Sequence, residues 1–289
     1  MQRSVEFRVT EAARCRGTLF TPTQQTAAVP CIVLANGVSM TTRDGVERFA
    51  AHFASQGFAA LTFDYRNFGA SDGQPRHLVD APLQVADVHA AFRYARSLDE
   101  VDSDRLALWG FSLGGGVSLA VASEIPDLAA MVLLCPMVDG LAFVFAGDVV
   151  NNLRMTGRLV RRAIARTHAS CEVVATGSGP SLFTQPEAGA GFERVRGADS
   201  DWTNEILLWP TRAAPTFRPI QRAGFISCPV LVSLGTQDTV VPSRPIAKTA
   251  RMLRRGTLQR HDIGHFDAFL GEFEDIAAVQ AAFLASTLY

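Results

Sequence analysis

Ser112 stands in a pattern that can activate a hydroxyl group. Positions 109–116 read WGFSLGGG, which places G-x-S-x-G directly after an apolar run and before an apolar helical pattern. A strand that turns at once into a helix strains the corner residue, so Gly110 and Gly114 leave room that a Cβ would fill. The helix dipole and the N–H of Leu113 then favour negative charge on a bound carbonyl oxygen. A chance match in a glycine-rich turn is the alternative.

A serine hydroxyl needs a base, and His265 is the best placed of the six histidines. It lies in DIGHFD at positions 262–267, in a loop after a short strand and before the last helical pattern. A loop there can reach the carboxyl edge of a parallel sheet, where the serine is expected. His52 and His89 fall within helical patterns instead. A helix-capping or solvated loop histidine is the alternative for His265.

Two aspartates are candidates for the carboxylate that holds the histidine. Asp238 lies in GTQDTVVP, directly after the apolar run 229–234, and Asp139 lies in PMVDG, after the run 131–135. The carboxylate accepts the proton-bearing nitrogen of His265, fixes its tautomer and stabilises the imidazolium. We favour Asp238, because Asp139 opens a segment that interrupts the strand pattern.

A second donor to the oxyanion is expected in the loop after the run Cys31–Ala35, which reads NGVSM at positions 36–40. Its glycine permits close approach of the backbone, and the N–H of Val38 is the predicted donor beside that of Leu113. An ordinary strand-to-helix turn is the alternative. The residues that we predict to contact the substrate are Gly37, Phe111, Trp202 and Asn204.

Short apolar runs alternate with helical patterns along most of the chain. The runs at 31–35, 59–63, 106–109, 131–135 and 229–234 lack alternation, as in strands that are covered on both faces. Val5–Val9 alternates instead, as in a half-exposed antiparallel edge strand. This repetition predicts an α/β fold with a doubly wound, mainly parallel sheet and helices on both faces.

The stretch between Cys135 and Cys228 breaks this rhythm, and we find no strand pattern in it. It holds an apolar piece at 141–145, an arginine-rich helical pattern at 151–167 and a glycine-rich turn at 176–181. A segment that long is usually functional or forms a small subdomain. We predict that residues 137–215 form an inserted, mostly helical cap and that residues 1–136 and 216–289 form the core domain.

The arginine-rich pattern contains no acidic residue from 151 to 166. Leu153, Val160 and Ile164 are predicted to face the core. A solvated helix face is the simpler interpretation of the arginines. The other is that they attract an anionic acyl donor, such as a CoA thioester or an acyl carrier. These arginines are Arg154, Arg158, Arg161, Arg162 and Arg166.

Composition limits the kinds of molecule and surface that the chain is expected to bind. The formal net charge of -1 gives no general attraction to nucleic acid or to a membrane surface, and no run approaches the ~18 apolar residues that span a bilayer. The charged, alternating start is unlike a signal peptide. The five cysteines form no CxxC pair, which favours buried free thiols and a reducing cytoplasm. A homodimer is one open possibility.

Together these motifs resemble the α/β-hydrolase superfamily from end to end. The serine elbow, the acid turn and the histidine loop GHF at 264–266 come in the family's order. FDYRNFGAS at 63–71 resembles its D-x-R-G-x-G-x-S loop, with Asn67 at the usual glycine. The oxyanion loop of the family often reads His-Gly, and here Asn36 takes the place of that histidine.

More narrowly, the chain resembles dienelactone-hydrolase-like and polyketide-transferase-like members, through WTNE at 202–205 and FRP at 217–219. Dienelactone hydrolases proper use cysteine at the elbow, so Ser112 argues against that activity. We expect a serine hydrolase that cleaves a small-molecule carboxylic ester or thioester through an acyl-serine intermediate, without metal or organic cofactor. An acyltransferase with the same triad and a non-catalytic ligand-binding member are the alternatives.

Overall fold

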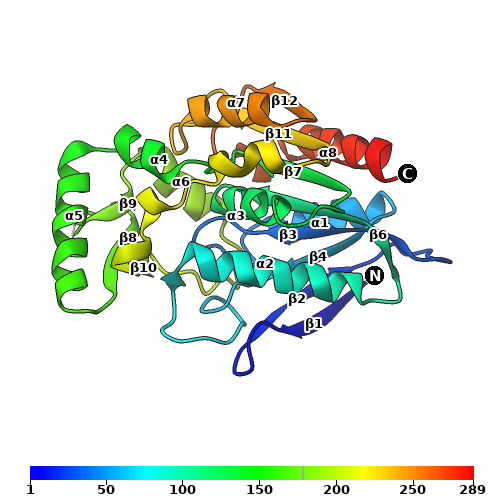
Figure 1. Cartoon of the computed structure of the whole chain (residues 1–289), viewed down its shortest axis with the longest axis horizontal. Coiled ribbons are helices and arrows are strands. Elements are labelled where there is room, and N and C mark those ends of the chain that lie inside the picture. Colours follow the sequence, from blue (N-terminus) through cyan, green and yellow to red (C-terminus); the bar gives the residue numbers. More distant parts are fainter. Residues whose placement is uncertain (178) are drawn as a thin grey trace.

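The computed structural model describes residues 1–177 and 179–289, and an eight-stranded sheet forms its centre (Figure 1). The strand order is β1-β2-β4-β3-β6-β7-β11-β12. β2 pairs antiparallel with β1 and β4, and every other neighbouring pair is parallel. The predicted mainly parallel sheet is confirmed, with the alternating segment in the antiparallel edge strand β1. The bounds are β1 Gln2–Arg8, β2 Arg14–Phe20, β3 Val29–Ala35, β4 Ala59–Phe63, β6 Val101–Phe111, β7 Ala130–Leu134, β11 Val230–Gly235 and β12 Gly256–His261.

Helices cover both faces of this sheet (Figure 1), which is why its central strands are buried along almost their whole length. α2 packs beside α3, and α1 packs beside α8. Phe49 of α1 lies 5.0 Å from the ring of Trp109 in β6 and 4.9 Å from Phe273 in α8, which joins one helix layer to the sheet. The bounds are α1 Val46–Ser55, α2 Ala81–Arg96, α3 Leu113–Ala122, α7 Ser243–Met252 and α8 Phe273–Leu288.

A second sheet of four strands, in the order β5-β10-β8-β9, lies beyond the carboxyl ends of the central strands (Figure 1). Three of its strands are β8 (Ala169–Val174), β9 (Ser181–Phe183) and β10 (Glu205–Leu208), so the prediction of a strandless segment was wrong. The fourth is β5 (Leu78–Val79), which comes before α2. β8 alternates between buried and half-buried positions, the mark of a strand covered on one face.

The helices of this segment are α4 (Gly140–Ala146), α5 (Val149–Ile164) and α6 (Pro186–Val195), followed by the 3-10 turns η1 (Pro210–Arg212), η2 (Ala214–Thr216) and η3 (Pro219–Phe225). The inserted segment is therefore mixed α/β rather than mostly helical. Its limits at 137 and 215 stay a prediction, as does its separation from the core.

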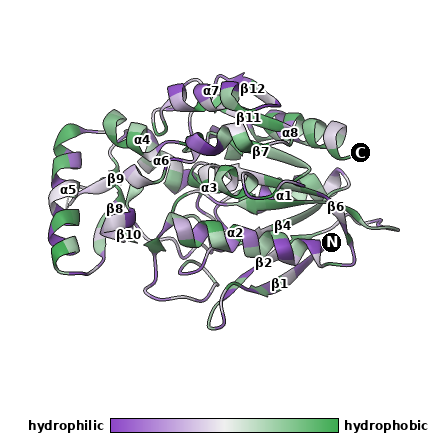
Figure 2. Cartoon of the chain, in the orientation of Figure 1, coloured by the Kyte–Doolittle hydropathy of each residue, from purple (hydrophilic) through white to green (hydrophobic). Residues whose placement is uncertain are grey.

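α5 lies at the outer edge of the molecule (Figure 1), and hydrophobic residues on it are prominent in Figure 2. Leu153 and Ile164 are 69% and 79% exposed, so the prediction that this side faces the core was wrong. α5 carries a second apolar stripe, because Met155 and Leu159 lie four positions apart, and these two pack against the core. Sequence periodicity alone does not decide which of two apolar stripes is covered.

All five cysteines are free and buried, which confirms the prediction of buried thiols. Among the described helices none is both long and apolar enough to cross a bilayer.

Candidate active site

Ser112 occupies the sharp turn between β6 and α3, with φ 51° and ψ -120°. Such positive φ is strained for a residue with a side chain. The turn is also crowded, since a Cβ on Gly110 would lie 2.5 Å from the carbonyl oxygen of Gly114. A Cβ on Gly114 would lie 2.3 Å from the carbonyl oxygen of Ala35. The two glycines of the motif are thus required by space, as the sequence predicts.

His265 and Asp238 come together at the carboxyl ends of the neighbouring strands β12 and β11. The distance from His265 Nδ1 to Asp238 Oδ2 is 2.7 Å, and each side chain is only 1% exposed. The other carboxylate oxygen accepts the N–H groups of Val240 and Val241, both at 2.8 Å. This arrangement can hold one imidazole tautomer, with the proton on Nδ1 and Nε2 free to act as a base.

The ring of His265 lies 4.8 Å from that of Phe111, the residue before Ser112. Between the described residues, no hydrogen bond joins the serine hydroxyl to the imidazole. Catalytic hydrogen bonds are often long or poorly aligned before substrate binds, so the lack of this bond is compatible with a serine–histidine pair.

Asp139 serves another purpose. Its carboxylate caps α4 by accepting the N–H groups of Leu141 and Ala142, at 3.1 and 3.3 Å. It also forms a two-pronged ion pair with Arg218, with both N–O distances 2.9 Å. Asp238 and not Asp139 is therefore the aspartate that contacts His265. Asp139 fastens the start of the inserted segment to η3.

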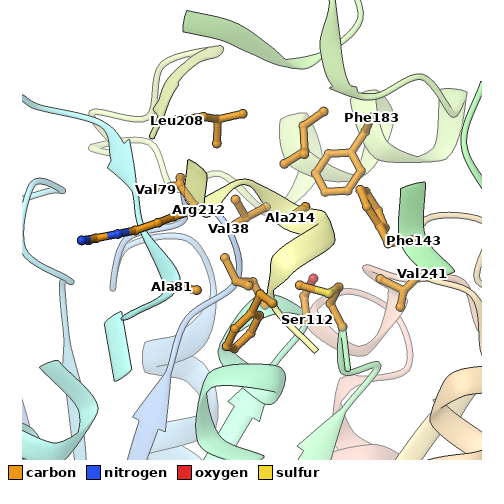
Figure 3. A pocket seen from close by; sticks show the side chains of 14 residues that line it. Val38, Val79, Ala81, Ser112, Phe143, Phe183, Leu208, Arg212, Ala214 and Val241 are labelled. Carbon is orange, nitrogen blue, oxygen red and sulfur yellow. The ribbon is translucent and has the colours of Figure 1, made fainter. Parts of the chain in front are cut away.

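Ser112, Leu113 and Val38 line one pocket between the central sheet and the second sheet (Figure 3). Leu113 is the first residue of α3, so its N–H has no acceptor within the helix. Most of the remaining wall is apolar. The guanidinium of Arg212 points away from Ser112 (Figure 3) and pairs with Asp80 at 2.9 Å. The other lining residues are Val79, Ala81, Met137, Phe143, Leu182, Phe183, Leu208, Ala214, Phe217 and Val241.

The four residues that we predicted to contact substrate do not belong to this described pocket wall. Phe111 is buried beneath the histidine loop, where its ring also lies 4.7 Å from Phe269. A Cβ on Gly37 would lie 3.0 Å from the ring of Phe111, so this glycine serves close packing.

Trp202 and Asn204 support neighbouring backbone. The indole N–H of Trp202 donates to Ser39 Oγ at 2.9 Å, beside the predicted donor Val38. The amide of Asn204 accepts the N–H of Val174 at 2.8 Å and donates to its carbonyl at 2.9 Å, which joins the start of β10 to β8. Trp202 therefore supports the loop at 36–40, and Asn204 supports the second sheet.

Sequence reasoning missed Glu187, in the first turn of α6. One of its oxygens accepts the backbone N–H of His265, and the other accepts the N–H of Thr239 at 2.8 Å together with its hydroxyl. No motif surrounds this glutamate, and only tertiary folding brings it beside the histidine loop.

Cys135 was also missed as a neighbour of the site. Its sulfur, an oxygen of Asp238 and a ring nitrogen of His265 all lie within 4.8 Å of one another. Burial, assisted by the negative charge of Asp238, raises the pKa of the Cys135 thiol well above its ordinary value. Thiolate is the metal-binding form of cysteine, so a protonated thiol here favours contact with the carboxylate over binding of a metal ion.

Comparison with known proteins agrees with this geometry. Residues 26–266 match the family model described as serine aminopeptidase, S33. The quorum-quenching protein AidA of Acinetobacter baumannii is 33% identical over 276 residues, which cover 94% of this chain and 90% of that protein. The thiohydrolase aneE of Aspergillus aculeatus is 27% identical over 217 residues, which cover 74% and 65%.

Solved structures give the same fold. The complex of DcsB with its substrate analogue superposes with a TM-score of 0.84 at 21% identity, over 100% of this chain and 99% of that one. The α/β-hydrolase GrgF of Penicillium superposes with a TM-score of 0.83 at 23% identity, with the same coverage. Both the family and the fold match the resemblance seen in the sequence. The chain belongs to the S33 family of serine hydrolases and has the α/β-hydrolase fold.

Proposed function

We propose that Ser112, His265 and Asp238 form the catalytic triad of an enzyme that cleaves a carboxylic ester or thioester with an apolar acyl group. The observation that carries this proposal is the position of the Ser112 side chain at the base of an apolar pocket (Figure 3). Asp238 holds Nδ1 of His265 at 2.7 Å, which leaves Nε2 to accept a proton. An apolar wall binds an acyl chain by removing its surface from water.

In this proposal Ser112 Oγ attacks the carbonyl carbon while His265 Nε2 takes the hydroxyl proton. The N–H groups of Leu113 and Val38 stabilise the oxyanion of the tetrahedral intermediate. Its collapse expels an alcohol or thiol, which receives the proton from His265, and leaves the acyl group on Ser112. Water, deprotonated by His265, then attacks the acyl-serine and releases the carboxylic acid.

Acyl transfer is the second candidate, since an alcohol or amine can replace water in the last step. The polyketide transferase grgF of a Penicillium species is 33% identical over 135 residues, although these cover only 47% of this chain. The acyltransferase drtE of Aspergillus calidoustus is 32% identical over 132 residues. Their names support transfer, and the name of thiohydrolase aneE supports hydrolysis.

An anionic acyl donor, such as a CoA thioester or an acyl carrier, is one substrate class that the arginines of α5 support. One of them, Arg158, donates to the carbonyl of Ser170 at 2.8 Å, so it also has a structural role.

The exposed apolar stripe of α5 supports a homodimer, which light scattering would test. Five free thiols support a reducing, cytoplasmic location.

Labelling with a fluorophosphonate tests the proposal. We expect one label per chain, on Ser112, and we expect Ser112→Ala to remove both the label and turnover, with kcat lowered by about 10³-fold or more. Ser118→Ala is the matched control, because Ser118 is a buried serine in the helix that follows the elbow. Equal labelling of the Ser112→Ala variant would refute the assignment. A series of esters and CoA thioesters, with and without added alcohols, separates hydrolysis from transfer.

A further inference from the structure

We propose that Glu187 is a positioning residue for this reaction, which fixes the histidine loop and the acid loop relative to each other. The inference rests on the proposed triad. Glu187 comes from α6, which belongs neither to the central sheet nor to either loop. Its carboxylate nevertheless contacts both loops. In the histidine loop it contacts His265 itself, and in the acid loop it contacts Thr239, the neighbour of Asp238.

The chemistry of a carboxylate suits this place. Three donors converge on it: the backbone N–H of His265, the backbone N–H of Thr239 and the Thr239 hydroxyl. An ionised carboxylate offers two oxygens that only accept, whereas an amide offers one oxygen and an NH2 group that donates. A glutamine at this position would therefore satisfy one loop and set its NH2 group against a donor of the other.

The two loops are consequently joined twice. His265 Nδ1 and Asp238 Oδ2 form the direct bond at 2.7 Å, and Glu187 forms a second bridge through the backbone. The direct bond fixes the imidazole relative to Asp238. The bridge fixes the main chain that carries the imidazole, and so its direction towards Ser112. Hydrogen bonds to a charged carboxylate are among the strongest in proteins, which makes this bridge stiff.

α6 packs closely against the histidine loop. A Cβ on Gly191 would lie 2.1 Å from the ring of Phe266, so only glycine allows this approach. The ring of Phe192 lies 5.0 Å from that of Phe266. On the loop, a Cβ on Gly264 would lie 2.5 Å from Glu187 Oε1. Two glycines, one on each side, therefore let the carboxylate reach the backbone.

Glu187 is absent from the described wall of the substrate pocket, so its loss should act on the chemical step and not on binding. The decisive variant is Glu187→Gln. Its matched control is Glu193→Gln, the same change on the same helix at a side chain that is 64% exposed. Within the described part of the chain, Glu193 pairs only with Arg196, at 3.4 Å. For each protein we would measure kcat and KM for a p-nitrophenyl ester. We would also measure the rate constant of fluorophosphonate labelling and the final number of labelled sites.

We expect Glu187→Gln to lower both kcat and the labelling rate constant by about 10- to 100-fold, the usual effect of misplacing a catalytic group by a fraction of an ångström to one ångström. KM should stay within about twofold, and the final label should still reach one site per chain. Glu193→Gln should match the wild type. A purely structural role would lower the number of sites and leave the rate constant of each remaining site unchanged, and that result would overturn the proposal.

If Glu187→Gln does not fold, Glu187→Asp replaces it. Aspartate keeps the charge but is one methylene shorter, so it reaches only one of the two loops, and we expect the same loss of kcat. A folded Glu187→Asp protein with wild-type kcat would overturn the proposal. Wild-type protein that fails to label at Ser112 would instead refute the triad, and with it this inference. If the wild type labels at Ser112 and a Glu187 variant labels at the same rate, only the inference about Glu187 fails.

Discussion

Asp238→Asn should disable the base without disturbing the fold. Oδ1 of Asp238 accepts two backbone N–H groups, from Val240 and Val241, each at 2.8 Å. An asparagine keeps these two bonds only if its oxygen takes the place of Oδ1, and this turns its NH2 group towards His265. The NH2 group then donates to Nδ1, which moves the imidazole proton to Nε2. In that tautomer Nε2 cannot accept the serine proton.

The magnitude follows from this switch. The same substitution in serine proteases of another fold lowers kcat by about 10⁴-fold, equivalent to about 5 kcal/mol of transition-state stabilisation. We expect a loss of this order here, because the side chains of Asp238 and His265 are both 1% exposed and water cannot replace the carboxylate. Asp139→Asn retains an oxygen to cap α4 and loses half of its pair with Arg218. We expect a change of less than about tenfold there.

Steady-state hydrolysis of a p-nitrophenyl ester by both variants provides the assay, with thermal unfolding to verify the fold. The reasoning fails if Asp139→Asn lowers kcat more than Asp238→Asn. It also fails if Asp238→Asn keeps more than about a tenth of wild-type activity, since the NH2 group would then not face Nδ1.

Three further outcomes are expected. Burial raises the pKa of Cys228 to about 11 and that of Cys171 to about 12, and all five thiols are buried, so a thiol reagent at pH 8 should react with them only after unfolding. Burial raises the pKa of Asp87 to about 6, against the effect of Arg66, so the folded state keeps a proton that the unfolded chain releases. The free energy of unfolding should therefore fall by up to about 3 kcal/mol between about pH 4 and pH 6, and urea titrations should show this loss reduced in Asp87→Asn. Trp202→Phe retains the aromatic ring but loses the hydrogen bond to Ser39, and kcat should drop about fivefold, equivalent to about 1 kcal/mol.

The arrangement around Ser112 could be predicted because its signals are local. Gly110 and Gly114 indicate the turn because neither carries a Cβ. The end of a buried strand is indicated by the end of an apolar run. Asp238 follows such a run and His265 follows a short strand, and parallel strands bring their carboxyl ends to one edge. Asp238 was preferred over Asp139 because Asp139 opens the segment that interrupts the strand pattern, and the structure shows Asp139 paired with Arg218 instead.

The inserted segment was harder to predict for physical reasons. β9 and β10 have only three and four residues, too few to show a period. Trp202 and Asn204 belong to a stretch that resembles relatives, yet their polar atoms bind Ser39 and Val174. Glu187 carries no local signal at all, because its three donors are 52 or 78 positions away in the chain.

The pairing of β5 with β10 has a consequence for how such enzymes can be recombined. Leu78 and Val79 lie well before the insertion, yet they form the edge of its sheet, and the N–H of Leu207 donates to the carbonyl of His77 at 2.9 Å. A chimera that exchanges only the inserted segment would leave β10 with a foreign neighbour and unmatched backbone groups. Grafts of substrate specificity between relatives should therefore carry the stretch before α2 as well, and the two pieces are expected to be inherited as one unit.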